Sequence, residues 1–243
     1  MLKKLIPVFY CLLVISGAAA QDSSALKKHY LKVYNQALNY NDVNAAINAL
    51  QNYIAADNSL LYKDTLSMLY FNVKNYYSSL LLAEEVYKTA PANVIAMARA
   101  AECYDELGDP KTATGLFEQV VTKIKNPYQV YKLAVCQYEI KRIAECEASA
   151  RAVLADTTSK KIGVNFTMAD GSQQAVPVNA AAANLLGVLK LDAKDYAGAK
   201  ADFQQALTLF PRFGGAKANI DVCDKNLKGP QKTSQKQPVK PKS

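Results

Sequence analysis

The side chains that most often carry out chemistry are few in this sequence, and they are not grouped. His29 is the only histidine in 243 residues, so a metal site with two histidines cannot form. No two cysteines have C-x-x-C spacing, and no glycine-rich loop precedes Lys-Ser or Lys-Thr. The adjacent carboxylates Glu84-Glu85 and Asp105-Glu106 would point about 100° apart on a helix, which does not suit a general acid and base. The sequence therefore predicts a protein that is not an enzyme and that binds no cofactor or metal.

The elements that carry these side chains are helices, and the segment 180–213 indicates this most clearly. An apolar-periodic stretch around Leu186 and Gly187 is followed by a turn and a second stretch that ends at Pro211. Gly187 is expected where the partner's backbone comes close, and Pro211 is expected to end the second helix. The second stretch has an apolar face with spacings of 3, 4 and 3, formed by Tyr196, Ala199, Phe203 and Ala206. These spacings predict two antiparallel helices.

This pattern resembles the tetratricopeptide repeat, a helix-turn-helix unit of 34 residues with Leu-Gly, Tyr, Ala, Phe, Ala and Pro at fixed positions. Ala183 stands where the repeat has its leading aromatic residue. Upstream, two sets of residues recur every 34 positions: Tyr70, Tyr104 and Tyr138, and Val86, Val120 and Leu154. We therefore predict an all-α array at 26–228 with about five helix pairs, at about 26–59, 60–93, 94–127, 128–160 and 180–213, and a polar-faced capping helix at 214–228.

One interval breaks the period, because 52 residues separate Tyr138 from the matching Lys190. The extra residues fall at about 161–178, where apolar residues alternate with polar ones around Asp170-Gly171. This pattern predicts a β-hairpin whose face of Val164, Phe166 and Val176 packs on neighbouring helices. Two interpretations remain open: an elaborate loop, or a gate or docking element.

The basic residues concentrate at the two ends of the chain. The net charge is +8, yet two lysines lie in the first four residues and six lie after Asp224, which leaves 21 basic residues to match 21 acidic ones. Residues 1–20 have the basic start, short apolar run and Ala18-Ala19-Ala20 site of a signal peptide. We therefore expect export, most simply to the periplasm and otherwise by secretion, and no membrane-spanning segment after cleavage. The alternative is an uncleaved amphiphilic anchor.

The segment 229–243 is rich in lysine, proline and glutamine and has almost no apolar content, which predicts a disordered tail. Its alternative role is a weak electrostatic contact with anionic envelope components. With the body of the chain neutral, nucleic acid is not an expected partner. Four cysteines remain after residue 20, all in predicted helices, which indicates buried thiols. A bond between Cys136 and Cys146 stays open, since sequence cannot give their separation.

Arrays of the tetratricopeptide family are right-handed superhelices whose first helices line a concave groove for a peptide or helix, and the resemblance implies the same here. It places thirteen residues in that groove: Leu61, Met68, Phe71, Ile95, Arg99, Glu102, Tyr128, Tyr131, Lys132, Tyr138, Asn184, Val188 and Leu191. Tyrosines at helical spacing are also common packing residues, so core positions are the alternative. The family's carboxylate clamp matches at only two of five positions, the five being Leu31, Asn35, Thr65, Ile95 and Arg99.

The sequence therefore predicts a non-enzymatic scaffold of the cell envelope that binds a protein or peptide in the groove. The alternative is a structural subunit of an outer-membrane or cell-wall assembly that docks through its convex or terminal faces and is tethered by its basic tail. Both rest on the likeness in fold, and one fold of this kind accommodates many partners.

Overall fold

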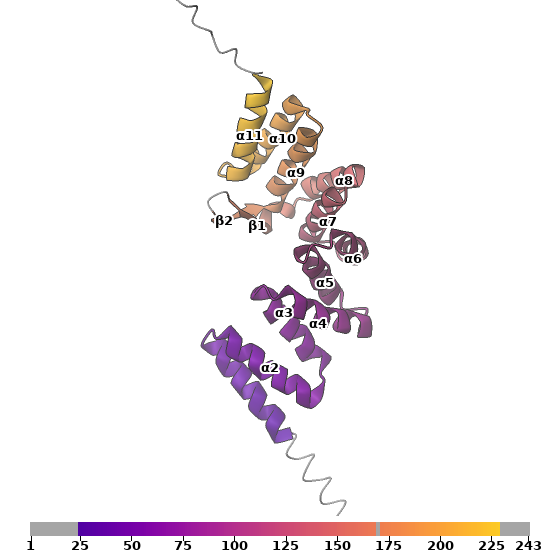
Figure 1. Ribbon diagram of the computed structural model, residues 1–243, viewed down its shortest axis with the longest axis vertical. Coiled ribbons are helices and arrows are strands. Elements are labelled where there is room, and N and C mark those ends of the chain that lie inside the picture. The colour runs from indigo at the N-terminus through magenta and orange to yellow at the C-terminus, as the bar shows by residue number, and fades with distance from the viewer. Residues whose placement is uncertain (1–23, 169–170, 229–243) are drawn as a thin grey trace, which may run out of the picture. The chain divides into compact units, whose positions relative to one another are not determined.

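The protein is built from paired helices in the part of the chain that the structure describes. The structure is a computed structural model, and it describes residues 24–168 and 171–228 (Figure 1). Residues 24–39 are helical. The helices that follow are α2 (Val43–Asp57), α3 (Leu60–Asn72), α4 (Tyr76–Thr89), α5 (Val94–Glu106), α6 (Pro110–Lys123), α7 (Pro127–Glu139), α8 (Ile143–Ala155), α9 (Val178–Asp192), α10 (Tyr196–Leu209) and α11 (Gly214–Leu227). The predicted all-α repeat fold is thus confirmed.

The chain divides into two compact units. Unit 1 ends at Ile124 and holds the helices up to α6, and unit 2 begins at Lys125 and holds α7 to α11. The sequence does not predict this division, because the 34-residue period continues through it. The predicted leader at 1–20 and the tail at 229–243 lie outside the described residues. Among the helices of the described part, none is long and apolar enough to cross a membrane.

The turns inside the helix pairs share one backbone conformation. Each has a residue with positive φ, between 55° and 83°, and these residues are Asn41, Lys74, Gly108, Lys141 and Lys194. In all five turns, the residue that follows donates its N–H to a carbonyl five positions earlier; the bond from Asp109 to Tyr104, for example, is 2.8 Å. In four of the turns the side chain of that residue then caps the next helix, as Asp195 does by accepting from the N–H of Gly198 at 2.9 Å. The exception is Arg142, whose side chain does not cap α8.

The core of unit 1 combines apolar packing with a buried contact between two serines. Ala83 of α4 packs with Ala100 and Cys103 of α5 at 0% exposure, which indicates close approach of these helices. Between α3 and α4, the hydroxyls of Ser67 and Ser79 donate to each other's backbone carbonyl at 2.9 and 2.8 Å. Because both hydroxyls are satisfied, this buried contact does not leave an unpaired polar group.

The core of unit 2 explains the requirement for glycine at position 187. A Cβ on Gly187 would lie 2.5 Å from the ring of Phe203, which is fully buried on α10. The prediction of a close approach was correct, but the approaching group is an aromatic side chain and not the partner's backbone. Pro211 follows the end of α10 at Leu209, and Phe210 adopts an extended conformation, as predicted.

The predicted hairpin is present in unit 2 as an antiparallel pair of β1 (Gly163–Thr167) and β2 (Gln173–Pro177). Val164 pairs with Val176, and Phe166 contacts the ring of Phe213, which precedes α11, with centroids 4.9 Å apart. Figure 1 shows the hairpin beside α9 and α11. Val164, Phe166 and Val176 all join the unit 2 core, which is the packing that the alternation predicted.

The four cysteines of the described part, Cys103, Cys136, Cys146 and Cys223, are buried thiols that form no disulfide with one another. Burial raises the pKa of the Cys146 thiol to about 11. Burial also raises the pKa of the Cys103 and Cys223 thiols. A thiol with a raised pKa is a poor nucleophile, so these three residues act as small apolar packing groups.

Candidate functional site

Exposed apolar side chains of α3 and α5 form the most open part of the predicted groove. Leu61 is 68% exposed, Ile95 59% and Met68 43%. Residues three, four and seven positions apart share one face of a helix, so Leu61 and Met68 lie on the same side of α3 as Asp64. We call the surface made by Leu61, Asp64, Met68, Ile95 and Arg99 the α3/α5 face.

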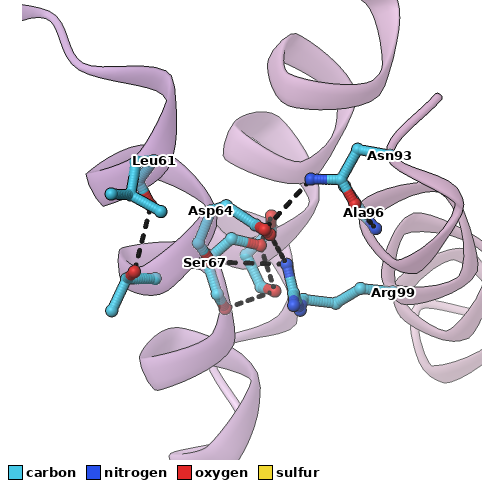
Figure 2. Close-up of polar contacts among 8 residues, drawn as sticks. Leu61, Asp64, Ser67, Asn93, Ala96 and Arg99 are labelled. Atoms are coloured by element: carbon cyan, nitrogen blue, oxygen red, sulfur yellow. Dashed lines mark hydrogen bonds and ion pairs between the residues drawn. The ribbon is translucent and has the colours of Figure 1, made fainter. Parts of the chain in front are cut away.

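A polar network fixes the two helices of this face against each other. Figure 2 shows the Asp64 carboxylate between Asn93 and Arg99 of the neighbouring repeat. The Asn93 Nδ2 donates to Asp64 Oδ2 at 3.0 Å, and Arg99 Nη1 forms an ion pair with Asp64 Oδ1 and donates to the Asp64 carbonyl at 3.3 Å. Asn93 also caps α5, because its Oδ1 accepts from the N–H of Ala96.

The network changes what Arg99 can offer a ligand. Its side chain is 12% exposed and that of Asp64 is 26% exposed, so the guanidinium is occupied by a carboxylate of the same protein. The α3/α5 face is therefore apolar at its outer positions, and its central charges neutralise each other. Sequence reasoning placed Arg99 here but missed Asp64 and Asn93. Opposite charges 35 positions apart, close to one repeat, were the available signal.

The other two predicted residues of unit 1 are less open. Phe71 is half-buried and packs edge-on against Tyr76 at 5.4 Å between centroids, within the apolar cluster of α4 and α5. Glu102 is half-buried on α5. Both lie at the border of the α3/α5 face, and their role in binding stays a prediction.

Two of the predicted residues of unit 2 lie in its core. Tyr131 is 6% exposed and packs in the same cluster as Ala181 and Leu185 of α9. Burial raises the pKa of its hydroxyl, as expected for a phenol held in apolar surroundings. Asn184 is 8% exposed and accepts a hydrogen bond from Asn219 Nδ2 at 3.1 Å. Neighbouring helices cover both residues in this structure, and their role in binding stays a prediction.

The remaining predicted residues of unit 2 are half-buried. Tyr138 donates to Asp192 Oδ2 at 2.7 Å, and this bond is the main reason that its pKa is raised to about 12. The Lys141 ammonium lies 4.9 Å from the centre of the same ring. Tyr128, Val188 and Leu191 pack at the margins of apolar clusters. Lys132 is also half-buried.

No protein-family model matches the chain, and no curated protein matches it. Solved structures do match. A tetratricopeptide repeat protein from Parabacteroides merdae superposes with a TM-score of 0.64 at 11% identity, covering 82% of this chain and 72% of that one. MamA from Desulfovibrio magneticus RS-1 superposes with a TM-score of 0.63 at 14% identity, covering 78% of this chain and 97% of that one.

YrrB, described as a TPR protein with an unusual peptide-binding site, gives a TM-score of 0.62 at 14% identity and covers 78% of this chain and 89% of that one. These similarities show that the chain has the tetratricopeptide-repeat fold. At such identities they concern the fold alone, so the use of the α3/α5 face has to be argued from its own residues.

Proposed function

We propose that this protein is a non-enzymatic interaction scaffold that binds an apolar peptide or helix of a partner protein against the α3/α5 face. The observation that carries the proposal is the exposure of Leu61, Met68 and Ile95 around a neutralised ion pair. Large apolar side chains on a surface whose central charges are satisfied favour an apolar ligand over a charged one. YrrB, a protein of the same fold with a peptide-binding site, supports a peptide as the class of ligand.

The place of action that we propose is the cell envelope, and its support is the leader pattern of residues 1–20. The basic segment 229–243 would add weak, salt-sensitive contact with anionic envelope components. No catalytic step belongs to the proposal. The one histidine, His29, is exposed on the helix at 24–39, where its nearest aromatic contact is Tyr30.

A second candidate function, docking into a larger assembly, is favoured by a different surface of unit 1. Tyr77 and Leu81 on α4 are 64% and 53% exposed. Leu81 borders a cleft of about 310 Å³ between α2 and α4 whose apolar lining includes Ile54, Leu66 and Leu82. We call Tyr77 and Leu81 the α4 face.

Paired variants distinguish the two faces. We expect Leu61→Ser with Ile95→Ser to abolish capture of a partner from envelope extract, and Tyr77→Ser with Leu81→Ser to leave it intact. All four positions are exposed, so both variants should melt within a few degrees of the parent protein. A photo-reactive residue at Met68 should cross-link the same partner, and one at Tyr77 should not. The reverse pattern would reject the α3/α5 face in favour of docking through the α4 face.

A further inference from the structure

The backbone of the hairpin has one free edge that keeps all of its hydrogen-bond donors. The bonds from Val178 N to Ile162 O and from Met168 N to Ser172 O, both 2.8 Å, lie at the two ends of the ladder. Antiparallel pairs alternate between bonded and non-bonded, so Val164 and Phe166 of β1 also face β2. The N–H and C=O groups of the intervening residues, Gly163, Asn165 and Thr167, therefore point away from β2.

The two edges of the hairpin differ. On β2 the outward positions are Gln173, Ala175 and Pro177. The proline has no N–H, so this edge cannot donate a hydrogen bond to an added strand at that position. On β1 all three outward residues have an N–H and are exposed. Among the described residues, none supplies a hydrogen-bond partner to these three backbone positions. An unpaired edge of this kind is a template for one more strand.

The side chains of β1 also lack cover. Val176 of β2 is fully buried, whereas its cross-strand partner Val164 and the next inward residue, Phe166, are only half-buried. A strand added beside β1 would place alternate side chains on this same face, next to Val164 and Phe166. Apolar residues at those alternate positions would complete the burial.

The charge beside this edge is basic. Lys160 and Lys161 lie in the short 3₁₀ turn directly before β1, and both are exposed. Neither takes part in an ion pair within residues 24–168 and 171–228. A strand antiparallel to β1 would end beside these lysines, so acidic residues at its C-terminal end would be favoured.

We propose that the free edge of β1 is a strand-addition site for an extended segment of a partner protein with alternating apolar side chains and acidic residues at its C-terminal end. The backbone bonds come from Gly163, Asn165 and Thr167, and the two lysines set the direction. This site belongs to the inserted segment and is separate from the α3/α5 face. Its failure would therefore leave the proposed function in place.

The first test uses a synthetic peptide and hydrogen exchange on the full-length chain. The peptide is Thr-Val-Thr-Val-Glu-Glu with a blocked N-terminus, and the control peptide ends in Lys-Lys. At about millimolar peptide, a concentration suited to weak binding, the amides of Gly163, Asn165 and Thr167 should become protected with the acidic peptide and much less with the basic one. No protection with the acidic peptide would overturn the proposal. Protection that rises with protein concentration alone would also overturn it, because the occupant would then be a second copy.

The second test uses matched proline variants. Asn165→Pro removes an outward N–H from β1, and Ala175→Pro removes one from β2, so neither takes a bond from the β1–β2 ladder. Loss of an outward backbone donor should weaken peptide binding about tenfold in Asn165→Pro and less than about twofold in Ala175→Pro. Equal weakening in both variants would reject the β1 edge. Lys160→Glu with Lys161→Glu, two exposed changes that leave the fold untouched, should reverse the preference between the two peptides.

Discussion

The two units differ in what they do with the residues at the predicted groove positions. In unit 1, Leu61, Met68 and Ile95 remain exposed. In unit 2, Tyr131 and Asn184 are covered by neighbouring helices. One repeat position shows the difference directly, because Ile95 of unit 1 is 59% exposed and Gln129 of unit 2, which lies 34 residues later, is 8% exposed. Repeat position alone therefore does not define a binding surface.

The contact between successive first helices accounts for this difference. In unit 1 a polar network of Asp64, Asn93 and Arg99 makes that contact, and the apolar residues next to it are left outside. In unit 2 the tyrosine ring of α7 packs in one cluster with Ala181 and its small neighbours on α9. Small residues let two helices approach closely, so a large apolar side chain there is buried.

The largest expected effect comes from truncating a buried residue of unit 2, compared with an exposed residue of unit 1. Tyr131→Ala should lower the free energy of unfolding by about 3 to 5 kcal/mol, because it removes a buried aromatic side chain from a packed cluster. Leu61→Ala, on the exposed face of unit 1, should change it by less than about 0.5 kcal/mol. Chemical denaturation of both variants provides the measurement. Similar values for the two would break the comparison.

Glycine substitutions give the next effect, and here the two units should differ in sign. Gly187→Ala in unit 2 should destabilise by about 1 to 3 kcal/mol, because the added Cβ meets the Phe203 ring. Gly115→Ala in α6 of unit 1 has open space around the new Cβ and should stabilise by about 0.5 to 1 kcal/mol. Thermal melting of the pair is sufficient, and a stabilising Gly187→Ala would contradict the packing described.

Removal of the central cation of the α3/α5 face should have a moderate effect. Arg99→Met leaves the partly buried Asp64 without its ion-pair partner and should cost about 1 to 2 kcal/mol. Arg151→Met in unit 2 breaks an ion pair with Glu147 in which both side chains are about half exposed, and should cause no measurable loss. Urea unfolding midpoints compare the two variants. Equal losses would mean that the network in unit 1 does not hold its helices together.

The smallest effect concerns two of the tyrosines that recur every 34 positions. Tyr104 of unit 1 donates to Glu84 on the preceding helix at 2.6 Å, whereas Tyr138 of unit 2 donates forward to Asp192. Both hydrogen bonds raise the tyrosine pKa to about 12, above the value of 10.0 without these contacts. Between pH 10 and 12 the folded state keeps a proton that the unfolded state loses. The contribution of these hydrogen bonds to the free energy of unfolding is therefore fully present below pH 10 and is lost as the pH rises towards 12.

Tyr104→Phe and Tyr138→Phe should each reduce this fall, and the double variant should reduce it further. Urea unfolding at a series of alkaline pH values provides the measurement, with Tyr40→Phe, at an exposed turn position, as the control. If Tyr40→Phe reduces the pH dependence of stability as much as Tyr104→Phe and Tyr138→Phe do, the two hydrogen bonds are not the source of that dependence.

Much of the architecture could be predicted from the sequence, because local patterns encode it. The residues that recur every 34 positions predicted the repeat, and Pro211 predicted the end of α10. The alternation around Asp170-Gly171 predicted a hairpin that packs by Val164 and Phe166. The turns were less readable, because lysines at 74, 141 and 194 occupy the left-handed conformation that usually favours glycine or asparagine.

The candidate surfaces depended on contacts between residues far apart in the chain. Composition and periodicity determined that this protein is a helical repeat array with one inserted hairpin, since each of those signals lies within a single repeat or turn. Only the tertiary structure decided that Asp64 neutralises Arg99, that Tyr131 is core, and that β1 rather than β2 keeps a complete edge. The physical reason is that burial and pairing depend on which neighbour covers a side chain, and the repeat pattern is the same whether or not that neighbour is present.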